Sequence, residues 1–228
     1  MNELIAGIIT LIFGSITEFK DVKGDKDPIT VNGITISKLH LDAIQALTVK
    51  EFEPLKFYQW KDSIIDTTNY GHWDSTMHGL IMFDVPEAEA RTIFNDFYNK
   101  IIYEGNYLYL THLYFDSLKN SYFDIAIVKV ETQYDVVKRV GTQSKNHDIS
   151  NEQVIEKLKE WDKKVRFKIM VVDVDRIEAY MGNEAWNVKK FAREVSEFCP
   201  DIIDQGYGSL DAMIKDYKAN KYFWLWWD

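Results

Sequence analysis

The most distinctive stretch of the sequence reads Phe198-Cys199-Pro200-Asp201-Ile202-Ile203-Asp204-Gln205-Gly206-Tyr207-Gly208-Ser209. Because the residue before a proline is disfavoured in the α region, we expect a helix to end at Cys199. The spacing of Asp201 and Asp204 places both carboxylates on one side of a helical turn. The two glycines allow backbone angles that other residues avoid. The stretch therefore predicts a helix end, a tight turn and a new helix capped by Ser209.

The sequence closes on Tyr222-Phe223-Trp224-Leu225-Trp226-Trp227-Asp228. Such an aromatic strand can lie in the middle of a sheet with both faces buried, or at an edge where it forms a docking surface. We expect the core strand, with Trp226 or Trp227 packed against the helix that ends at Phe198. The Asp228 carboxylate then needs a partner, either an Arg or Lys or the backbone amides of the turn at Gly206.

These motifs give the sequence from about residue 107 to residue 228 a resemblance to the bacterial family called domain of unknown function 4253. The resemblance also rests on Thr142…Asn146-His147-Asp148-Ile149 and on the helical segment 154–161. Relatives often have Asn-Tyr-Asp where this chain has Asn146-His147-Asp148. The residues that we assign to its binding or structural motif are Cys199, Pro200, Asp201, Asp204, Gln205, Gly206, Trp226, Trp227, Asp228, Thr142 and Asn146. The resemblance implies a compact α+β domain and no assigned activity.

Composition and pattern set the size and class of the fold. The chain has 228 residues, of which 46% are hydrophobic and 14% aromatic, enough for one large domain or two small ones. We expect an α+β fold with a mixed or antiparallel sheet and packed helices. A soft boundary between residues 84 and 106 divides a less recognisable part, 1–95, from a family-like domain, 96–228. The two parts can also form one continuous globule on a shared sheet.

Local signals predict most of the individual elements. Asn32-Gly33 between β-branched runs predicts a hairpin with a type I′ turn. Asp84 with Glu87 predicts a capping box at the start of a helix that Gly105 ends. Ser150 with Gln153 predicts a second capping box. Further elements are expected as a short helix at 39–47, strand-like pieces at 57–60 and 79–83, strands at 107–115, 122–130, 165–172 and 176–181, and a helix at 186–198.

The charge balance and the single cysteine exclude several classes of protein. A net charge of −9 and a pI near 5.1 argue against nucleic-acid binding, which needs basic patches. One cysteine rules out an internal disulfide and a cysteine-rich zinc site. Cys199 lies at the C-terminal end of its predicted helix, where a thiolate is not favoured, so we expect a buried, inert thiol rather than a nucleophile.

The N-terminal segment 1–14, which is apolar from Leu4 onward, needs a separate interpretation. It carries Glu3 instead of a basic start, no small-residue cleavage site follows, and it is too short to span a bilayer. We expect a helix buried against the domain or a partner, and a protein that is cytoplasmic and does not bind membranes.

Two readings of the acidic residues remain open. Asp201, Asp204 and Asp228, helped by Gln205, could hold Mg²⁺ or Ca²⁺ or share acid–base catalysis if the last strand lies beside the motif. Alternatively Asp201 and Asp204 accept backbone hydrogen bonds at helix ends, and Gln205 satisfies buried backbone groups. We expect the structural reading, with no metal and no cofactor. The five histidines fit no recognisable ligand or triad spacing.

Function follows only weakly from these features. The leading hypothesis is a non-catalytic protein-binding domain of the immunity type, because the chain is acidic, rich in aromatics and without a cofactor motif. The rival hypothesis is a metal-assisted hydrolase that uses Asp201, Asp204 and Asp228. A third hypothesis is a structural or assembly module that uses the N-terminal apolar segment.

Overall fold

The computed structural model describes residues 28–55, 57–59, 72–74, 78–182 and 186–228. The apolar segment 4–14 lies outside these residues. The elements are β1 (Pro28–Val31), β2 (Ile34–Ser37), α1 (Lys38–Gln45), β3 (Glu53–Pro54), β4 (Phe57–Gln59), β5 (His72–Asp74), β6 (Gly79–Pro86), α2 (Glu87–Tyr103), β7 (Tyr107–Phe115), β8 (Ser121–Val128), α3 (Gln133–Val140), α4 (Asn151–Val165), β9 (Phe167–Val172), β10 (Arg176–Met181), α5 (Val188–Phe198), the π-helical turn η2 (Ile202–Tyr207), α6 (Leu210–Asn220) and β11 (Tyr222–Trp226).

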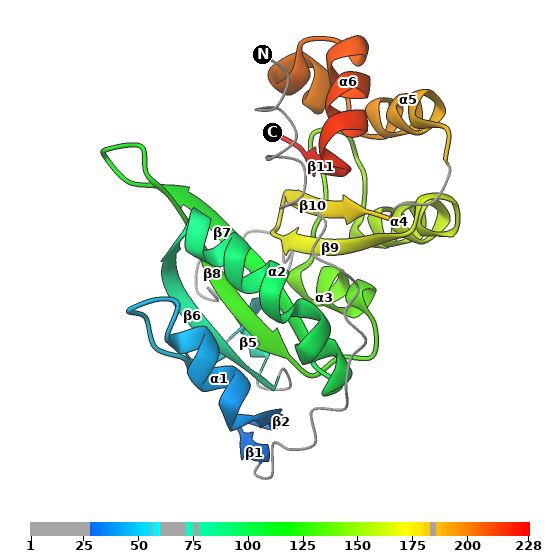
Figure 1. Cartoon of the computed structure of the whole chain (residues 1–228). Helices are drawn as coiled ribbons and strands as arrows, with labels where there is room; N and C mark the ends of the chain where they lie inside the picture. Colours follow the sequence, from blue (N-terminus) through cyan, green and yellow to red (C-terminus); the bar gives the residue numbers. More distant parts are fainter. Residues whose placement is uncertain (1–27, 56, 60–71, 75–77, 183–185) are drawn as a thin grey trace, which may run out of the picture.

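The main sheet has the strand order β11-β10-β9-β7-β8-β6-β3 (Figure 1). Its neighbours pair antiparallel except β7 and β9, which run parallel and meet at Leu110 and Val171. The predicted α+β class with a mixed sheet is therefore confirmed. Two short hairpins, β1–β2 and β4–β5, form separate antiparallel pairs.

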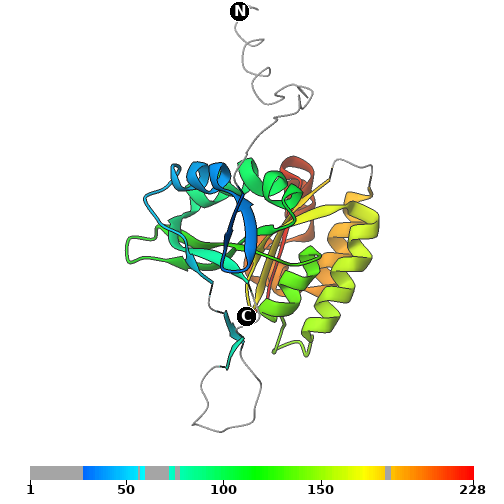
Figure 2. The same cartoon turned by 90° about the horizontal axis from the view of Figure 1, so that it is seen from below.

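Helices cover opposite faces of the two halves of this sheet. Leu41 of α1 and Phe94 of α2 share one apolar cluster with the inner residues of β6, β7 and β8. Trp161 of α4, Phe191 of α5 and Tyr217 of α6 share a second cluster with β9, β10 and β11. Figure 2 shows α1 and α2 on one side of the sheet and α3 and α4 on the other. The face of β10 and β11 that α5 and α6 do not cover consequently lies beside α2, and none of the described helices packs over it.

Local sequence signals explain several element boundaries. Asn32 and Gly33 have φ of 43° and 79°, as a type I′ turn requires, so the predicted hairpin is confirmed. Ser150 and Gln153 form the predicted capping box, and Ser209 accepts a hydrogen bond from the amide of Ala212 at the start of α6. The helix α3 was not predicted, although Thr132 and Asp135 form a capping box there.

The predicted helix start at Asp84 is wrong. Strand β6 continues to Pro86, where it pairs with Tyr122 of β8, and α2 begins only at Glu87. Asp84 instead sits at a β-bulge with φ of 57°, and its amide donates to the Asp124 carboxylate. Strand pairing therefore outcompetes the capping box. Gly105, with φ of 75°, follows the end of α2 as expected.

The aromatic strand lies in the sheet, but not at its centre. Within the described residues β11 pairs only with β10 and forms one end of the sheet. Phe223 and Leu225 are buried, whereas Tyr222, Trp224 and Trp226 remain partly exposed. The expectation of a strand buried on both faces is therefore wrong, because α5 and α6 cover only one face. Trp227, 1% exposed, packs edge-to-face against Phe198 at 5.9 Å, as predicted.

The sheet crosses the sequence boundary proposed between residues 95 and 96. That boundary falls inside α2, and β6, from before it, pairs with β8, from after it. No helix among the described residues is long and apolar enough to cross a membrane.

Candidate functional site

The family-like motifs, far apart in the sequence, meet around the C-terminal end of β11. The loop after α3, the turn after α5 and the last residues of the chain all contribute to this cluster. Asp201 is its central side chain, and it is 9% exposed. Its Oδ2 accepts a hydrogen bond from the amide of Asp228 at 3.1 Å. His147 Nε2 lies 3.1 Å from each carboxylate oxygen of Asp201. One buried carboxylate thus joins all three segments.

Thr142 and Asn146 fix the loop after α3 in place. The Thr142 hydroxyl, fully buried, donates to the carbonyl of Asp173 in the β9–β10 turn at 2.6 Å. Asn146 Nδ2 donates to the main-chain oxygen of Asp228. Both motif residues therefore clamp this loop to strands that lie far along the chain. His147, in the same loop, supplies the contact to Asp201.

Asp204 and Gln205 do not join this cluster. Both are exposed on η2, and within the described part of the chain Asp204 accepts no hydrogen bond. The spacing argument that placed Asp201 and Asp204 on one side of a turn is wrong, because the turn is π-helical and does not follow the α-helical period. Gln205, being exposed, satisfies no buried backbone group.

The convergence of Asp201, Asp204 and Asp228 proposed for a metal site is therefore incomplete. Asp228 contacts Asp201 through its main-chain amide and not through its carboxylate, and an amide N–H cannot bind a cation. Among the residues that the structure describes, no group of three or more His, Cys, Asp or Glu side chains has the geometry to hold a metal ion. The arrangement of these carboxylates therefore supports the hypothesis of a metal-assisted hydrolase less well than the sequence did.

Gly206 has a packing role. An added Cβ would lie 2.5 Å from Cη2 of Trp224, so only glycine leaves room for the indole. Trp224 Nε1 donates to the hydroxyl of Tyr207 at 2.9 Å, and Tyr207 donates to Asp216 of α6 at 2.9 Å. The turn η2 is therefore fastened to the outer side of β11 and to α6.

Cys199 is buried beneath the same strand. Its thiol donates to the carbonyl of Trp226 at 3.0 Å. Burial raises the pKa of the thiol to about 12. Cys199 is accordingly protonated at neutral pH, and the expected buried thiol is observed.

Residues 124–228 match the model of the family described as domain of unknown function (DUF4253). The resemblance expected from the motifs is confirmed for this C-terminal half. The match begins inside β8 and includes every contact around Asp201 described above. Neither a curated protein nor a solved structure matches the chain.

A buried charge network lies on the other face of β10. The Glu178 carboxylate is fully buried and receives Arg91 of α2 at 3.0 Å and Arg176 of β10 at 2.6 Å. The hydroxyl of Tyr222 also donates to it. Desolvation by burial is the largest single influence on Arg91 and opposes its charge, but Glu178, Tyr222 and Glu87 together outweigh it and raise the pKa of Arg91. The network ties α2 of the N-terminal part to β10 and β11.

Beside this network the aromatic residues of β11 form a partly exposed face. We call Tyr222, Trp224, Trp226 and the neighbouring Arg176 the aromatic face. The three aromatics alternate along one side of β11. The Arg176 guanidinium lies 5.8 Å from the ring centre of Trp224. The sequence contains the period-2 pattern of this face, but its position at the sheet edge depends on the order of the strands.

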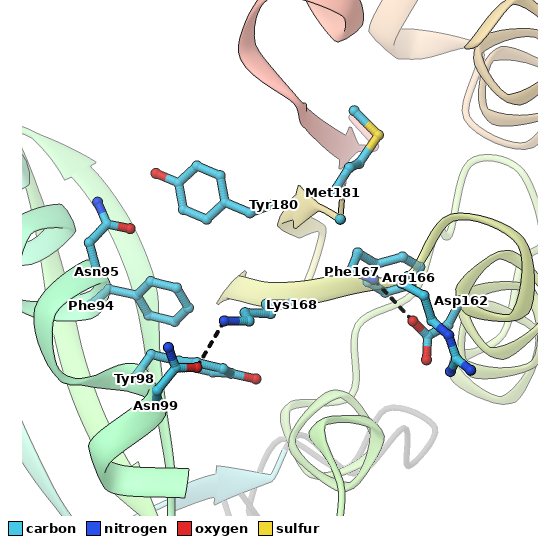
Figure 3. Close-up of a pocket in the computed structure, with 11 residues that line it drawn as sticks. Phe94, Asn95, Tyr98, Asn99, Asp162, Arg166, Phe167, Lys168, Tyr180 and Met181 are labelled. Atoms are coloured by element: carbon cyan, nitrogen blue, oxygen red, sulfur yellow. Dashed lines mark hydrogen bonds between the residues drawn. The ribbon is translucent and has the colours of Figure 1, made fainter. Parts of the chain in front are cut away.

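An open cleft lies at the other end of β10, between α2 and the β9–β10 hairpin (Figure 3). Its volume is about 600 Å³. The lining includes Phe94, Asn95, Tyr98 and Asn99 of α2, Lys168 of β9 and Tyr180 of β10. The sequence predicted Phe94 only as part of the apolar stripe of its helix, and it predicted no site formed by these side chains. They come from segments more than sixty residues apart, and no local motif links them.

A further cluster of polar side chains lies at paired bulges of the sheet. His112 Nδ1 is 3.1 Å from Asp124, whose pKa is raised by burial. Asp84 and His112 both have positive φ, at 57° and 52°. The hydroxyl of Tyr114 donates to Asp84 at 2.7 Å. This group was also missed, because the spacing of His112 and Asp124 matches no known motif.

Proposed function

We propose that this protein is a non-catalytic protein-binding domain of the immunity type, which neutralises a partner protein in a bacterial cytoplasm. The observation that supports the proposal best is the aromatic face. Tryptophan, tyrosine and arginine are the residues that most often dominate binding energy at protein interfaces. Tyr222, Trp224, Trp226 and Arg176 bring all three types together on one partly exposed side of a sheet edge.

The face is also held rigid, which favours binding. Trp224 is fixed by its hydrogen bond to Tyr207, and Tyr222 by its hydrogen bond to Glu178. Side chains that are already ordered lose less conformational entropy when a partner binds. Gly206 packs directly against the indole of Trp224, and the Cys199 thiol donates to the main-chain carbonyl of Trp226, so both motif residues hold the same strand. On this proposal the motif supports the binding strand and does not catalyse a reaction.

Charge indicates the kind of partner. The chain carries a net charge of −9, so its field attracts a basic protein and speeds the encounter. On the aromatic face itself Arg176 is paired with Glu178, which keeps the local charge nearly balanced. We therefore propose a basic protein whose contact surface is largely apolar.

The experiment pairs this protein with the products of its neighbouring genes. Each product is co-expressed with the chain, and its binding and its inhibition of cell growth are measured. We expect one basic product to bind and its inhibition to be relieved. Trp226→Ala should weaken this binding at least tenfold, since truncating a central aromatic typically costs about 2 kcal/mol or more.

A matched control distinguishes the face from aromatic surface in general. Tyr103 at the end of α2 is 93% exposed and lies outside the aromatic face, so Tyr103→Ala should leave binding unchanged. Circular dichroism must show that both variants stay folded. Full neutralisation by the folded Trp226→Ala variant would place the binding surface elsewhere and remove the main support for the proposal.

A further inference from the structure

The cleft between α2 and the β9–β10 hairpin has the dimensions of a ligand site. Its volume of about 600 Å³ falls within the range of roughly 300–1,000 Å³ that is usual for small-molecule pockets. It opens beside the helix and not on the aromatic face of β11. Tyr180 of β10 lines the cleft and also lies next to the aromatic face, with its ring centre 5.6 Å from that of Tyr222.

Aromatic rings form one part of the cleft wall. Phe94 and Tyr98 lie one turn apart on α2, with ring centres 4.8 Å apart. Tyr180 stands opposite on β10, 6.3 Å from Phe94 (Figure 3). Phe94 and Tyr98 are 2% and 8% exposed, so they form the floor of the cleft, and the partly exposed ring of Tyr180 is the one that a flat ligand can stack on. The wall therefore favours a planar, aromatic group.

A lysine supplies the charge of the cleft. Lys168 Nζ donates to Asn99 Oδ1 at 2.8 Å and lies 5.3 Å from the ring centre of Tyr98. In the described ranges no carboxylate forms an ion pair with Lys168 or with Arg166, the other cation of the lining. With one carboxylate, Asp162, also in the lining, the two cations leave the cleft with a net charge of about +1, which attracts an anion.

Asp162 is the one carboxylate in the lining, and both of its oxygens accept hydrogen bonds from neighbouring groups. Asp162 Oδ1 accepts the amide of Phe167 at 3.0 Å, and its Oδ2 accepts the hydroxyl of Tyr134 at 2.9 Å. Figure 3 shows this carboxylate at the α4–β9 junction, where it is bonded to Phe167. Asn95 and Asn99, four residues apart on α2, add amide groups that can bond to polar substituents on a ring.

We propose that this cleft binds a small ligand that combines a planar aromatic ring with a carboxylate or phosphate group. The ring packs among Phe94, Tyr98 and Tyr180, and the anion is held by Lys168. Asn95 and Asn99 bond to the edge of the ring. This site goes beyond the proposed protein-binding function, because it uses a different part of β10 and a different partner.

Isothermal titration calorimetry with matched pairs of probes tests the proposal. The first pair is 2-naphthoate and its uncharged amide, 2-naphthamide. The second pair is adenosine 5′-monophosphate and adenosine. We expect at least one anion to bind at least tenfold more tightly than its neutral analogue. The pair that shows this difference tells whether the natural anion is a carboxylate or a phosphate.

Three variants locate the binding. Lys168→Met keeps the aliphatic stem but removes the charge, and it should weaken binding of the anion about tenfold. Asn95→Asp, on the exposed surface of α2, adds a negative charge to the cleft and should weaken it likewise. Lys100→Met is the matched control, because Lys100 also lies over an aromatic ring, Phe97 at 4.4 Å, but does not line the cleft. It should bind as tightly as the wild type.

Three results would overturn the proposal. The first is that neither anion binds at millimolar concentration. The second is that the neutral analogues bind as tightly as the anions. The third is that Lys168→Met and Asn95→Asp, both folded by circular dichroism, bind as tightly as Lys100→Met. A failure of the protein-binding proposal would leave these titrations unaffected, so the two ideas are tested separately.

Discussion

At the level of single residues, the two aspartates of the motif have different surroundings despite their short spacing. Asp201 is buried and joins His147 to the amide of Asp228, whereas Asp204 is exposed on η2. Removing a buried acceptor leaves its donor without a partner, which costs more than the hydrogen bond itself contributes. The cost of substitution should therefore fall on Asp201.

We predict that Asp201→Ala lowers the free energy of unfolding by about 1–3 kcal/mol, since it removes the acceptor of the partly buried hydrogen bond from the Asp228 amide. Asp204→Ala should change it by less than about 0.5 kcal/mol, as is usual for exposed positions. Urea denaturation measures both values. The opposite order would mean that Asp204 carries a contact that its exposed position does not indicate.

The buried thiol of Cys199 predicts a dependence of stability on alkaline pH. Burial raises its pKa from the ordinary value of 9.0 to about 12. Below about pH 9 the thiol is protonated in both the folded and the unfolded state, so the folded state loses nothing. Between about pH 9 and pH 12 only the unfolded chain ionises, and the free energy of unfolding must decrease as the pH rises.

Comparison with Cys199→Ala isolates this effect from the ionisation of the tyrosines. The difference in unfolding free energy between wild type and variant should be constant up to about pH 8. It should then shift against the wild type by up to about 1.4 kcal/mol for each pH unit above 9. A constant difference between pH 8 and pH 11 would show that the thiol ionises as easily in the folded protein as in the unfolded chain.

At the level of elements, the contact between η2 and β11 depends on Gly206. We predict that Gly206→Ala lowers the free energy of unfolding by about 1–3 kcal/mol, because the new methyl group overlaps the indole of Trp224. Removing the indole should relieve this clash. In a double-mutant cycle with Trp224→Ala, the two losses should therefore be far from additive.

Gly208 provides the control for this cycle. It has φ of 70° and no atom near the position of an added Cβ, so Gly208→Ala costs backbone strain of about 1–2 kcal/mol and touches no neighbour. Its effect should add to that of Trp224→Ala. Thermal or urea unfolding of the three single variants and the two double variants decides the matter. Additive losses for Gly206→Ala would place its cost in the backbone instead of in the packing.

Elements with a complete local signal could be predicted from the sequence. The Asn32-Gly33 turn and the Ser150 cap depend on a few adjacent residues, and both form as expected. Asp84 carried an equally clear capping signal, but pairing between β6 and β8 overrode it. The same limit applies to β11, since its place at the sheet edge is decided by strand order and not by its own residues.

The candidate sites show the same limit. Asp201 could be recognised within its motif, but its partner His147 lies 54 residues away. The cleft and the Glu178 network join α2 to β9 and β10 across more than sixty residues. Contacts of this range follow from how the sheet closes, and a short sequence window contains no trace of them.

At the level of the whole molecule, the family match and the folding unit do not coincide. The match begins at residue 124, inside β8, while both neighbours of β8 in the sheet, β6 and β7, precede it. Ile125 and Ile127 of β8 pack into the cluster beneath α2. A chain cut at residue 124 would expose this apolar surface and leave β9 without its parallel neighbour β7.

We predict that a fragment of residues 124–228 does not fold by itself. Its sheet would lose the pairing on both sides of β8, and the Glu178 network would lose Arg91 of α2. Glu178 would keep Arg176 but lose one of the two cations that compensate its buried carboxylate, which is destabilising. Far- and near-ultraviolet circular dichroism and thermal melting should show a chain without cooperative unfolding.

The control is residues 28–228, which contains every described element and should melt cooperatively. If the fragment 124–228 also melts cooperatively, with the near-ultraviolet signal of packed tryptophans, its residues do not need the strands before β8. The sheet would then be two folding units joined at the β7–β9 pair and not one.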